Sequence, residues 1–303
     1  MTADAARADE GAAADAAAPP ASSTALYAIP TTRDQIGRIV APVMVNGRGP
    51  FRFMIDTGAN HTVISAALMP VLGLVADPQL RISVRGVNGT IMAPSAHVTS
   101  LDAGSMHYRE VQVPVLAGPV LTGIDGILGL DTLDHRSLTA DFEHDRIGIG
   151  QAFSGAPLGD DVVPARLVSQ HLFEIDGLVG NVHVKAIIDT GGPRSLGNLA
   201  LWNALRRGAN ASVGAVPTNV VDATEVLQSA SFEQVASMRF GKTTLTKPYV
   251  TFGDFQVFKM WGLEDQPALL LGMDVLGVFA EMTIDYRRLE FGLRPRSEML
   301  ALH

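Results

Sequence analysis

The chain has 303 residues and contains no cysteine. Disulfide bonds, thiolate metal sites and cysteine nucleophiles are therefore excluded, while the redox compartment stays undecided. The chain also lacks the Gly-x-Ser-x-Gly and His-Glu-x-x-His motifs, which removes the common serine-hydrolase and zinc-protease classes. Gly148-Ile149-Gly150 lacks the third glycine of a dinucleotide-binding fingerprint, so no cofactor is expected.

Positive charge and long apolar runs are scarce as well. The chain has 23 Lys and Arg residues against 31 Asp and Glu residues, a formal net charge of −8. Nothing resembles a basic patch, so a nucleic-acid partner is not expected. The longest apolar runs, residues 267–271 and 275–280, are too short to cross a bilayer, so no transmembrane segment is expected.

The N-terminus lacks the basic region and apolar core of a secretory signal. Residues 1–36 begin with a stretch rich in Ala, Asp and Pro, which predicts a disordered leader. A pro-segment is the alternative, but the leader offers few apolar anchors for one. Such a leader often follows a signal that has been removed, which favours an exported, periplasmic protein over a cytoplasmic one.

One motif is present in two copies. Phe53-Met54-Ile55-Asp56-Thr57-Gly58-Ala59-Asn60 is matched by Ala186-Ile187-Ile188-Asp189-Thr190-Gly191-Gly192-Pro193, with the aspartate 133 positions later (189 − 56). In each copy an apolar run with strand character leads to an Asp in a turn marked by Gly. Two copies in matching contexts are hard to assign to chance.

The segments downstream of the two motifs also match, Gly129-Leu130-Asp131 with Gly272-Met273-Asp274. Short strand-like runs separated by turn residues fill both halves, so the pattern predicts an internal duplication of β-rich lobes. The predicted parts are lobes at 37–150 and 162–295, a linker at 151–161 and a tail at 296–303. Helices are expected over 66–72 and 195–207, and one strand over 232–240.

The paired Asp-Thr-Gly motifs, each with a downstream apolar-apolar-Gly segment, resemble those of the pepsin and retropepsin-like aspartic proteases. The closest likeness is to bacterial retropepsin-like proteins of the Asp-Thr-Gly-Ala type, duplicated here in one chain. The resemblance covers roughly residues 37–295 and excludes the leader. It implies a mostly all-β, two-lobed, pseudo-symmetric acid-protease fold with short helices and an active site between the lobes.

The resemblance also implies an aspartic endopeptidase that acts on a polypeptide substrate. Asp56 and Asp189 would share one proton, as is known for aspartic-protease dyads in general, and would activate a water between them. The hydroxyls of Thr57 and Thr190 would each bond to the opposite lobe. Because both motifs lie in one chain, dimerisation is not required. The residues expected to support the dyad are Thr57, Gly58, Thr190, Gly191, Gly129 and Gly272.

A flap is expected at Gly86-Val87-Asn88-Gly89, because Asn-Gly is the strongest short hairpin signal in the chain. Such a hairpin would close over the substrate and exclude water. The corresponding segment of the second lobe, Val220-Val221-Asp222-Ala223-Thr224-Glu225, contains no glycine. One mobile flap, from the first lobe, is therefore expected.

The sequence departs from the family pattern beside both aspartates. Asp131 and Asp274 stand where the viral enzymes carry an Arg, and Asn60 and Pro193 replace the acidic partner of that Arg. That ion pair is therefore absent from both lobes.

Ala59 and Gly192 stand where pepsin-like enzymes usually carry Ser or Thr. A hydroxyl there can stabilise the carboxylate and lower its pKa. Its absence predicts a weakly acidic to near-neutral optimum rather than a strongly acidic one.

Other interpretations stay open beside these. A catalytically silent peptide- or ligand-binding protein could use the same cleft. His61, near the first motif, is more typical of a solvated or capping histidine than of a catalytic one. Asp141-Phe142-Glu143-His144-Asp145 could suggest a metal site, but without a second cluster a solvated hairpin is favoured and no metal is expected.

Overall fold

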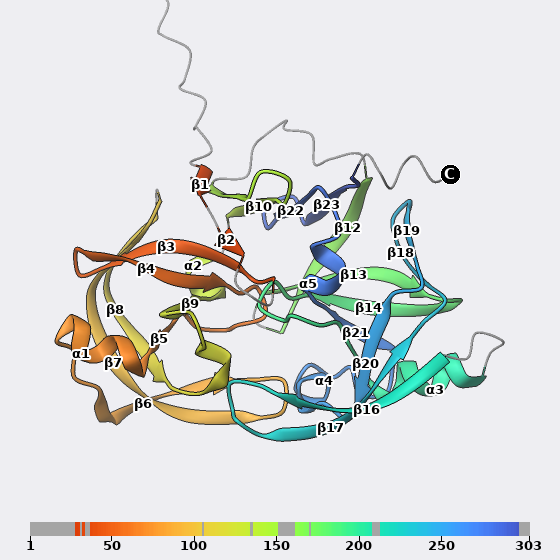
Figure 1. The fold of residues 1–303 in the computed structure, drawn as a ribbon, viewed down its shortest axis with the longest axis horizontal. Helices are drawn as coiled ribbons and strands as arrows, with labels where there is room; N and C mark the ends of the chain where they lie inside the picture. Colours follow the sequence, from red (N-terminus) through yellow and green to blue (C-terminus); the bar gives the residue numbers. More distant parts are fainter. Residues whose placement is uncertain are drawn as a thin grey trace, which may run out of the picture.

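The computed structural model describes residues 28–296, with gaps at 31, 34–36, 105, 134–135, 151–160, 170 and 208–212. Strands dominate this part of the chain and form two lobes, one from each half of the sequence (Figure 1). The longest helix among the described residues is α3 (Leu199–Arg207). The fold is thus the mostly β, two-lobed fold that the sequence predicts.

The first lobe is a sheet that closes on itself. Its hydrogen-bonded order is β2-β3-β4-β9-β5-β8-β7-β6, and an additional pairing of β3 with β7 joins six of these strands into a ring. Closure of this kind removes free strand edges. The strands are β2 (Thr32–Arg33), β3 (Ile39–Val45), β4 (Arg48–Ile55), β5 (Val63–Ser65), β6 (Asp77–Arg85), β7 (Thr90–Ala103), β8 (Met106–Leu116) and β9 (Gly126–Leu128). The helical segments are η1 (Ala66–Leu68), α1 (Met69–Leu72), η2 (Pro119–Leu121) and α2 (Leu130–Leu133).

The second lobe repeats this plan, with parallel pairing of β14 and β21 in place of β4 and β9. Its strands are β13 (Leu172–Val179), β14 (Val182–Ile188), β15 (Leu196–Gly197), β16 (Val213–Val221), β17 (Leu227–Gln234), β18 (Ser237–Phe240), β19 (Thr243–Thr246), β20 (Tyr249–Gly253) and β21 (Ala268–Leu271). Its helices are α3, α4 (Gln256–Met260) and α5 (Met273–Leu276).

Two predicted elements of the second lobe are wrong in their extent. The strand predicted over 232–240 is broken into β17 and β18, because the N–H of Val235 and the carbonyl of Ala236 bond to the β19–β20 connection and turn the chain. The helix predicted over 195–207 begins only at Leu199. The Oδ1 atom of Asn198 accepts the Leu201 N–H at 2.9 Å and caps that helix.

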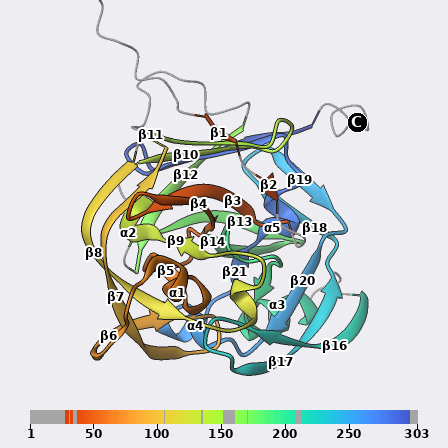
Figure 2. The same cartoon turned by 60° about the vertical axis from the view of Figure 1, so that its left-hand side comes forward.

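A third set of strands joins the two halves and lies along the top in Figures 1 and 2. Its order is β1-β11-β10-β22-β23-β12, so strands of the first half of the chain (β1, β11, β10) lie beside strands of the second half (β22, β23, β12) and pair with them through β10 and β22. These strands are β1 (Ala28–Pro30), β10 (Ser137–Asp141), β11 (Arg146–Gly150), β12 (Asp161–Val168), β22 (Glu281–Asp285) and β23 (Glu290–Arg294).

This joining sheet corrects the expectation for the leader. β1 and β2 fall within residues 1–36, where the composition predicts disorder, yet β1 pairs with β11 and β2 with β3. A short strand can form there because the neighbouring edges supply its backbone partners. Residues 1–27 of the predicted leader and most of the predicted linker lie outside the described residues. The predicted domain boundaries themselves stay a prediction.

The hydrophobic core extends through both lobes as one continuous cluster. A smaller cluster in the first lobe, which includes Met54, Val63 and Ile127, lies between that core and the cleft described below. Ile55 and Ile188, which immediately precede the two aspartates, are fully buried. No helix in the described part of the chain is long and apolar enough to cross a membrane.

Candidate active site

Strands β4 and β14 each deliver an aspartate to the centre of the molecule. The three residues before each aspartate are buried, as expected for strands with neighbours on both faces. The amide N–H of Asp56 donates to the carbonyl of Leu128, and that of Asp189 to the carbonyl of Leu271, at 3.0 Å each. Strands β9 and β21, which carry the apolar-apolar-Gly segments, therefore fix the backbone of each aspartate at the end of its strand.

Thr57 and Thr190 link the two loops. The hydroxyl of Thr57 donates to the carbonyl of Ile188, and that of Thr190 to the carbonyl of Ile55, each at 2.8 Å. Each hydroxyl also accepts the amide N–H of the other threonine, at 3.1 and 3.2 Å. Both side chains are fully buried. This reciprocal network is the one implied by the family resemblance, and it holds the two aspartates in a defined relative position.

Gly58 and Gly191 each lie against the carboxylate of the opposite lobe. A Cβ atom at Gly191 would lie 2.2 Å from Cγ of Asp56, and one at Gly58 would lie 2.9 Å from Oδ1 of Asp189. These distances are shorter than Cβ contacts in proteins, so only glycine permits this approach.

Gly129 and Gly272 permit a second close approach. A Cβ atom at Gly129 would lie 2.5 Å from the backbone carbonyl carbon of His61, and one at Gly272 would lie 2.6 Å from that of Arg194. Each apolar-apolar-Gly segment therefore passes directly beside the aspartate loop of its own lobe, as the sequence predicts.

The carboxylate of each of the two aspartates accepts hydrogen bonds from two amides of its own loop. Oδ1 of Asp56 accepts the N–H groups of Gly58 and Ala59 at 2.8 and 3.0 Å, and Oδ1 of Asp189 accepts the two corresponding groups at 2.9 Å each. The backbone thus supplies two donors to each carboxylate, although neither Ala59 nor Gly192 offers a hydroxyl.

Burial raises the pKa of both carboxyl groups. The pKa of Asp189, a residue that is only 7% exposed, is raised well above its usual value because the charge of Asp56 adds to the effect of burial. For Asp56, burial raises the pKa, while the loop amides, the hydrogen bond with Asp189 and the charge of buried Arg38 oppose the rise. Both carboxyls therefore favour the protonated form more than a solvated aspartate does, and a negative charge on Asp56 favours it further at Asp189.

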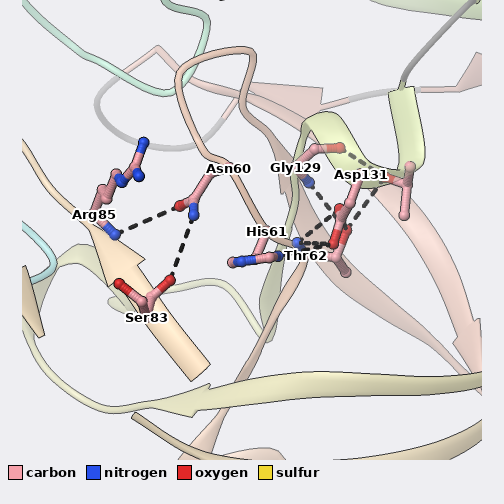
Figure 3. Close-up of polar contacts among 8 residues, drawn as sticks. Asn60, His61, Thr62, Ser83, Arg85, Gly129 and Asp131 are labelled. Carbon is pink, nitrogen blue, oxygen red and sulfur yellow. Dashed lines mark hydrogen bonds and ion pairs between the residues drawn. The ribbon is translucent and has the colours of Figure 1, made fainter. Parts of the chain in front are cut away.

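Sequence reasoning missed Thr62 and Ser195, which bind the two aspartates that replace the viral Arg. The hydroxyl and amide N–H of Thr62 donate to Asp131 at 2.7 and 2.8 Å (Figure 3). Ser195 repeats both bonds with Asp274, at 2.7 and 3.0 Å. Each hydroxyl also accepts the N–H of the glycine in its own apolar-apolar-Gly segment, at 3.1 Å. The available signal was a hydroxyl residue at the same offset in both copies (62 − 56 = 195 − 189 = 6).

Asn60 and His61 lie between the first Asp-Thr-Gly motif and Thr62 (Figure 3). Asn60 points toward strand β6, and His61 lies beside Asp131. Asn60 donates to the carbonyl of Ser83 at 3.4 Å and accepts the Arg85 N–H at 3.5 Å, two long contacts with the C-terminal end of β6. Nδ1 of His61 lies 3.6 Å from Oδ2 of Asp131. His61 therefore pairs with a carboxylate of its own lobe.

Two hairpins, not one, lie over the cleft. Residues 86–89 connect β6 with β7, closed by a bond from the Gly86 N–H to the Gly89 carbonyl at 2.9 Å. Residues 222–226 connect β16 with β17 without any glycine. There Asp222 makes the turn, because its carboxylate accepts the Thr224 N–H at 2.8 Å. The flap candidate of the second lobe therefore forms a hairpin without glycine, whereas the expectation of one mobile flap stays a prediction.

The tips of the two hairpins are bonded to each other. Oδ2 of Asp222 accepts the Asn88 N–H at 2.6 Å. Nδ2 of Asn88 donates to the carbonyls of Val220 and Val226 at 3.0 and 2.8 Å. The carbonyl of Val87 accepts the N–H of Val257 in α4 of the second lobe at 2.9 Å. Together these contacts, here called the tip latch, close a roof across the cleft.

A cavity of about 340 Å³ lies between the aspartates and this roof. Asp56 and Asp189 line it together with Gly58 and Gly191. Of the predicted flap residues, Gly86 and Val87 also line it, while the side chain of Asn88 turns into the other hairpin. The wall is mostly apolar, with Met54, Leu116 and Ile127 from the first lobe and Leu196, Trp261 and Leu270 from the second.

The acidic cluster at the β10–β11 turn lies outside this cavity. Asp141, Glu143 and His144 bring ligand atoms close together at the surface. Oδ1 of Asp141 accepts the amide N–H groups of Glu143 and His144, and Oδ2 lies 2.8 Å from Nδ1 of His144. These contacts are those of a capped hairpin turn, the interpretation favoured by the sequence.

Both halves of the chain match family models. Residues 41–135 match the model described as "gag-polyprotein putative aspartyl protease", and residues 174–275 match the model described as "Aspartyl protease". No curated protein matches the chain. The chain therefore belongs to the retropepsin-like aspartyl proteases, with two such domains in tandem. Each matched range contains one Asp-Thr-Gly motif and its apolar-apolar-Gly partner.

Proposed function

We propose that this protein is an aspartic endopeptidase that hydrolyses internal peptide bonds through a water held between Asp56 and Asp189. The observation that carries the proposal is the reciprocal placement of the two carboxylates. Each is bound by amides of its own loop and faces the glycine of the other loop. Family membership supports protease activity in general, and the dyad mechanism is the more specific proposal.

The two carboxylates take different roles at the start of the reaction. Ionised Asp56 accepts a proton from the water, whose oxygen adds to the carbonyl carbon of the scissile bond. Asp189 donates its proton to the carbonyl oxygen, which gives a neutral tetrahedral intermediate. The proton held by Asp56 then passes to the leaving nitrogen as the C–N bond breaks. The hydroxyl proton of the intermediate returns to Asp189, so the dyad ends with one proton.

The shape of the cleft supports an extended polypeptide as the substrate. Hairpins β6–β7 and β16–β17 border the cavity from above, and backbone groups of such edges bind extended peptides by strand addition. Closure of the tip latch over a bound peptide would exclude bulk water. Because both aspartates belong to one chain, a monomer contains the complete site.

The decisive test is cleavage of a peptide library by the wild type and by Asp56→Asn and Asp189→Asn. Each substitution removes one of the two proton carriers, so each should lower kcat by at least about 10³-fold. Asp145→Asn, in the surface turn between β10 and β11, is the matched control and should cut the library at the wild-type rate. Unchanged products from either dyad variant would rule out the mechanism.

The pH dependence gives a second test. The active form carries one proton on the pair, so activity falls below the lower apparent pKa and above the higher one. Because burial raises the pKa of both groups, both limbs of the pH–rate profile shift to higher pH. We therefore expect a weakly acidic to near-neutral maximum of kcat. A maximum below about pH 3, toward the lower pepsin value, would contradict this expectation.

A catalytically silent peptide- or ligand-binding protein is the alternative, since the roofed cavity suits binding as well as hydrolysis. Binding of library peptides with no cleavage across pH 3–8 would favour that alternative. The exported location expected from the leader also stays a prediction. Fractionation of cells that express the full-length protein would test it.

A further inference from the structure

We infer that Arg194 forms a subsite for a substrate carboxylate on the second-lobe side of the cleft. This inference rests on the proposed function, because it assigns a preference to the peptide that the same cleft would hold. Arg194 lines the cavity and is exposed. It directly follows Pro193, the residue after the second Asp-Thr-Gly-Gly motif, and so belongs to the aspartate loop itself.

The guanidinium of Arg194 lies over the aromatic ring of Phe232. Its Cζ atom lies 4.7 Å from the ring centroid of Phe232 on β17, within the range of a cation–π contact. The other neighbour of Phe232 is Tyr249, whose ring is stacked on it with centroids 4.8 Å apart and an angle of 7° between the planes. Stacking leaves the N–H groups at the edge of the guanidinium plane available to a carboxylate.

The guanidinium of Arg194 is not paired with a carboxylate in the described part of the chain. Among the described residues, none forms an ion pair or a side-chain hydrogen bond with its guanidinium, whereas Arg206, which is stacked on Trp202 in the same way, pairs with Glu233. The carboxyl of Asp274 senses the charge, since Arg194 opposes the rise in the pKa of Asp274 that partial loss of hydration at that carboxyl causes. Asp274 is nevertheless bound by Ser195 and not by Arg194.

The other acidic groups of the cavity are also engaged. Asp222 accepts hydrogen bonds from Asn88 and Thr224 in the roof. Asp56 and Asp189 bind their own loop amides and share a proton in the proposed mechanism. A carboxylate brought by the substrate is therefore the group that would complete the coordination of Arg194.

The first lobe offers no equivalent cation at the matching position. His61 stands there, five residues after its aspartate as Arg194 is (61 − 56 = 194 − 189), and it lies 3.6 Å from Asp131 (Figure 3). A peptide in the cleft would thus meet an unpaired cation on one side of the scissile bond and a paired histidine on the other. The preference for a carboxylate should therefore be one-sided.

Such a carboxylate can come from an Asp or Glu side chain or from the C-terminus of a short substrate. The test uses one cleaved peptide in which Glu, Gln or Lys is placed at each flanking position, in amidated and free-acid forms. The enzymes are the wild type, Arg194→Gln, Arg194→Glu and, as a control, Arg287→Gln, whose exposed side chain lies outside the cavity.

At one position, wild-type kcat/KM should favour Glu over Gln by roughly threefold to tenfold, less at high salt. Arg194→Gln should abolish that ratio, Arg194→Glu should favour Lys instead, and Arg287→Gln should keep the wild-type ratio. A preference for the free acid over the amide, lost in Arg194→Gln, would identify the chain terminus as the source. A preference for Glu or for the free acid that persists in Arg194→Gln, or the absence of both preferences in the wild type, would overturn the inference.

A failure of the proposed function would look different. If the wild type cuts none of the peptides, their affinities are compared by fluorescence anisotropy with the same four proteins. Tighter binding of Glu peptides that Arg194→Gln abolishes would retain the carboxylate subsite in a non-catalytic protein. Equal affinities for Glu and Gln peptides, or no binding at all, would overturn the subsite as well.

Discussion

In the first lobe the aspartate loop continues through Ala59-Asn60-His61, and in the second through Gly192-Pro193-Arg194. The two loops use the same bonds wherever they contact each other or their own apolar-apolar-Gly segment. They differ at the residues that border the cleft and the hairpins. The duplicated residues therefore position the dyad, whereas the unlike residues make its two sides chemically different.

The roof shows the same division. Both lobes carry a hairpin above the cleft, but one turn is made by Gly86 and Gly89 and the other by the Asp222 side chain. A Cβ atom at Gly86 would lie 2.2 Å from Oδ2 of Asp222, so the first tip must be small where the second carries its carboxylate. The two hairpins are complementary partners rather than copies.

The largest effect expected from breaking the symmetry concerns the two motif glycines. Gly191→Ala would drive a methyl group into the Asp56 carboxylate, and Gly58→Ala would meet Asp189 at a less severe distance. We expect a loss of activity of at least about 100-fold for Gly191→Ala and a smaller loss for Gly58→Ala. Peptide cleavage rates measure both.

Gly150→Ala is the control, because nothing lies within 4 Å of the added methyl group. Overpacking at Gly191 should also lower the unfolding free energy by about 1–3 kcal/mol. Thermal stability should therefore be measured alongside the cleavage rates. Equal losses of activity for Gly58→Ala and Gly191→Ala would contradict the asymmetry in these contacts.

A medium effect is expected from replacing Thr57 and Thr190, whose hydroxyls link the two lobes. Thr57→Val and Thr190→Val each leave a buried carbonyl of the opposite lobe without its donor, which should cost about 1–3 kcal/mol of unfolding free energy. Because each hydroxyl also accepts the amide of the other threonine, the double variant should lose less than the sum of the two. Urea unfolding of all three variants measures this.

Thr244→Val, at an exposed position of β19, is the matched control and should change the unfolding free energy by less than about 0.5 kcal/mol. Strictly additive losses of unfolding free energy for the Thr57 and Thr190 variants would show that the two hydroxyls act independently. That result would contradict the coupling expected from the reciprocal hydrogen bonds.

The smallest effect is expected at the tip latch. Asn88→Ala removes both side-chain bonds to the second hairpin, together with the Oδ1 atom that is buried without a hydrogen-bond partner. We expect amide exchange at both tips to accelerate by roughly threefold to tenfold, with the global stability nearly unchanged. Hydrogen exchange measured by mass spectrometry resolves residues 86–89 from 222–226.

Asn219→Ala, which changes an exposed side chain of the same hairpin, should leave exchange at the tips unaltered. Acceleration confined to residues 86–89 would mean that the first hairpin opens alone. That outcome would support the single mobile flap expected from the sequence.

Much of the site was predictable because its chemistry is local and repeated. An apolar strand, an Asp and a glycine turn must follow one another for a carboxylate to emerge from a buried strand. The repeated motif therefore singled out Asp56 and Asp189, and the family resemblance implied their role. Thr62 and Ser195 were findable in the same way. Arg38 was not, because a single buried arginine beside Asp56 leaves no repeated pattern.

The misjudged elements share one physical reason. The second hairpin turns on a side-chain hydrogen bond of Asp222, which replaces the glycine that turn rules look for. The break between β17 and β18 and the strand β1 depend on partners supplied by distant segments. Propensity describes a residue in its local context, and tertiary partners override it at such places.

The sequence by itself determined the duplicated aspartate motif, the β-rich lobes around it and the family to which the chain belongs. Only the tertiary structure decided which glycine faces which carboxylate and that the two hairpin tips bond to each other. It also decided that Arg194 has no ion-pair partner among the residues that the structure describes. Sequence patterns encode strands, turns and buried faces, because these depend on neighbouring residues. Contacts between groups more than a hundred residues apart depend on how the two lobes pack.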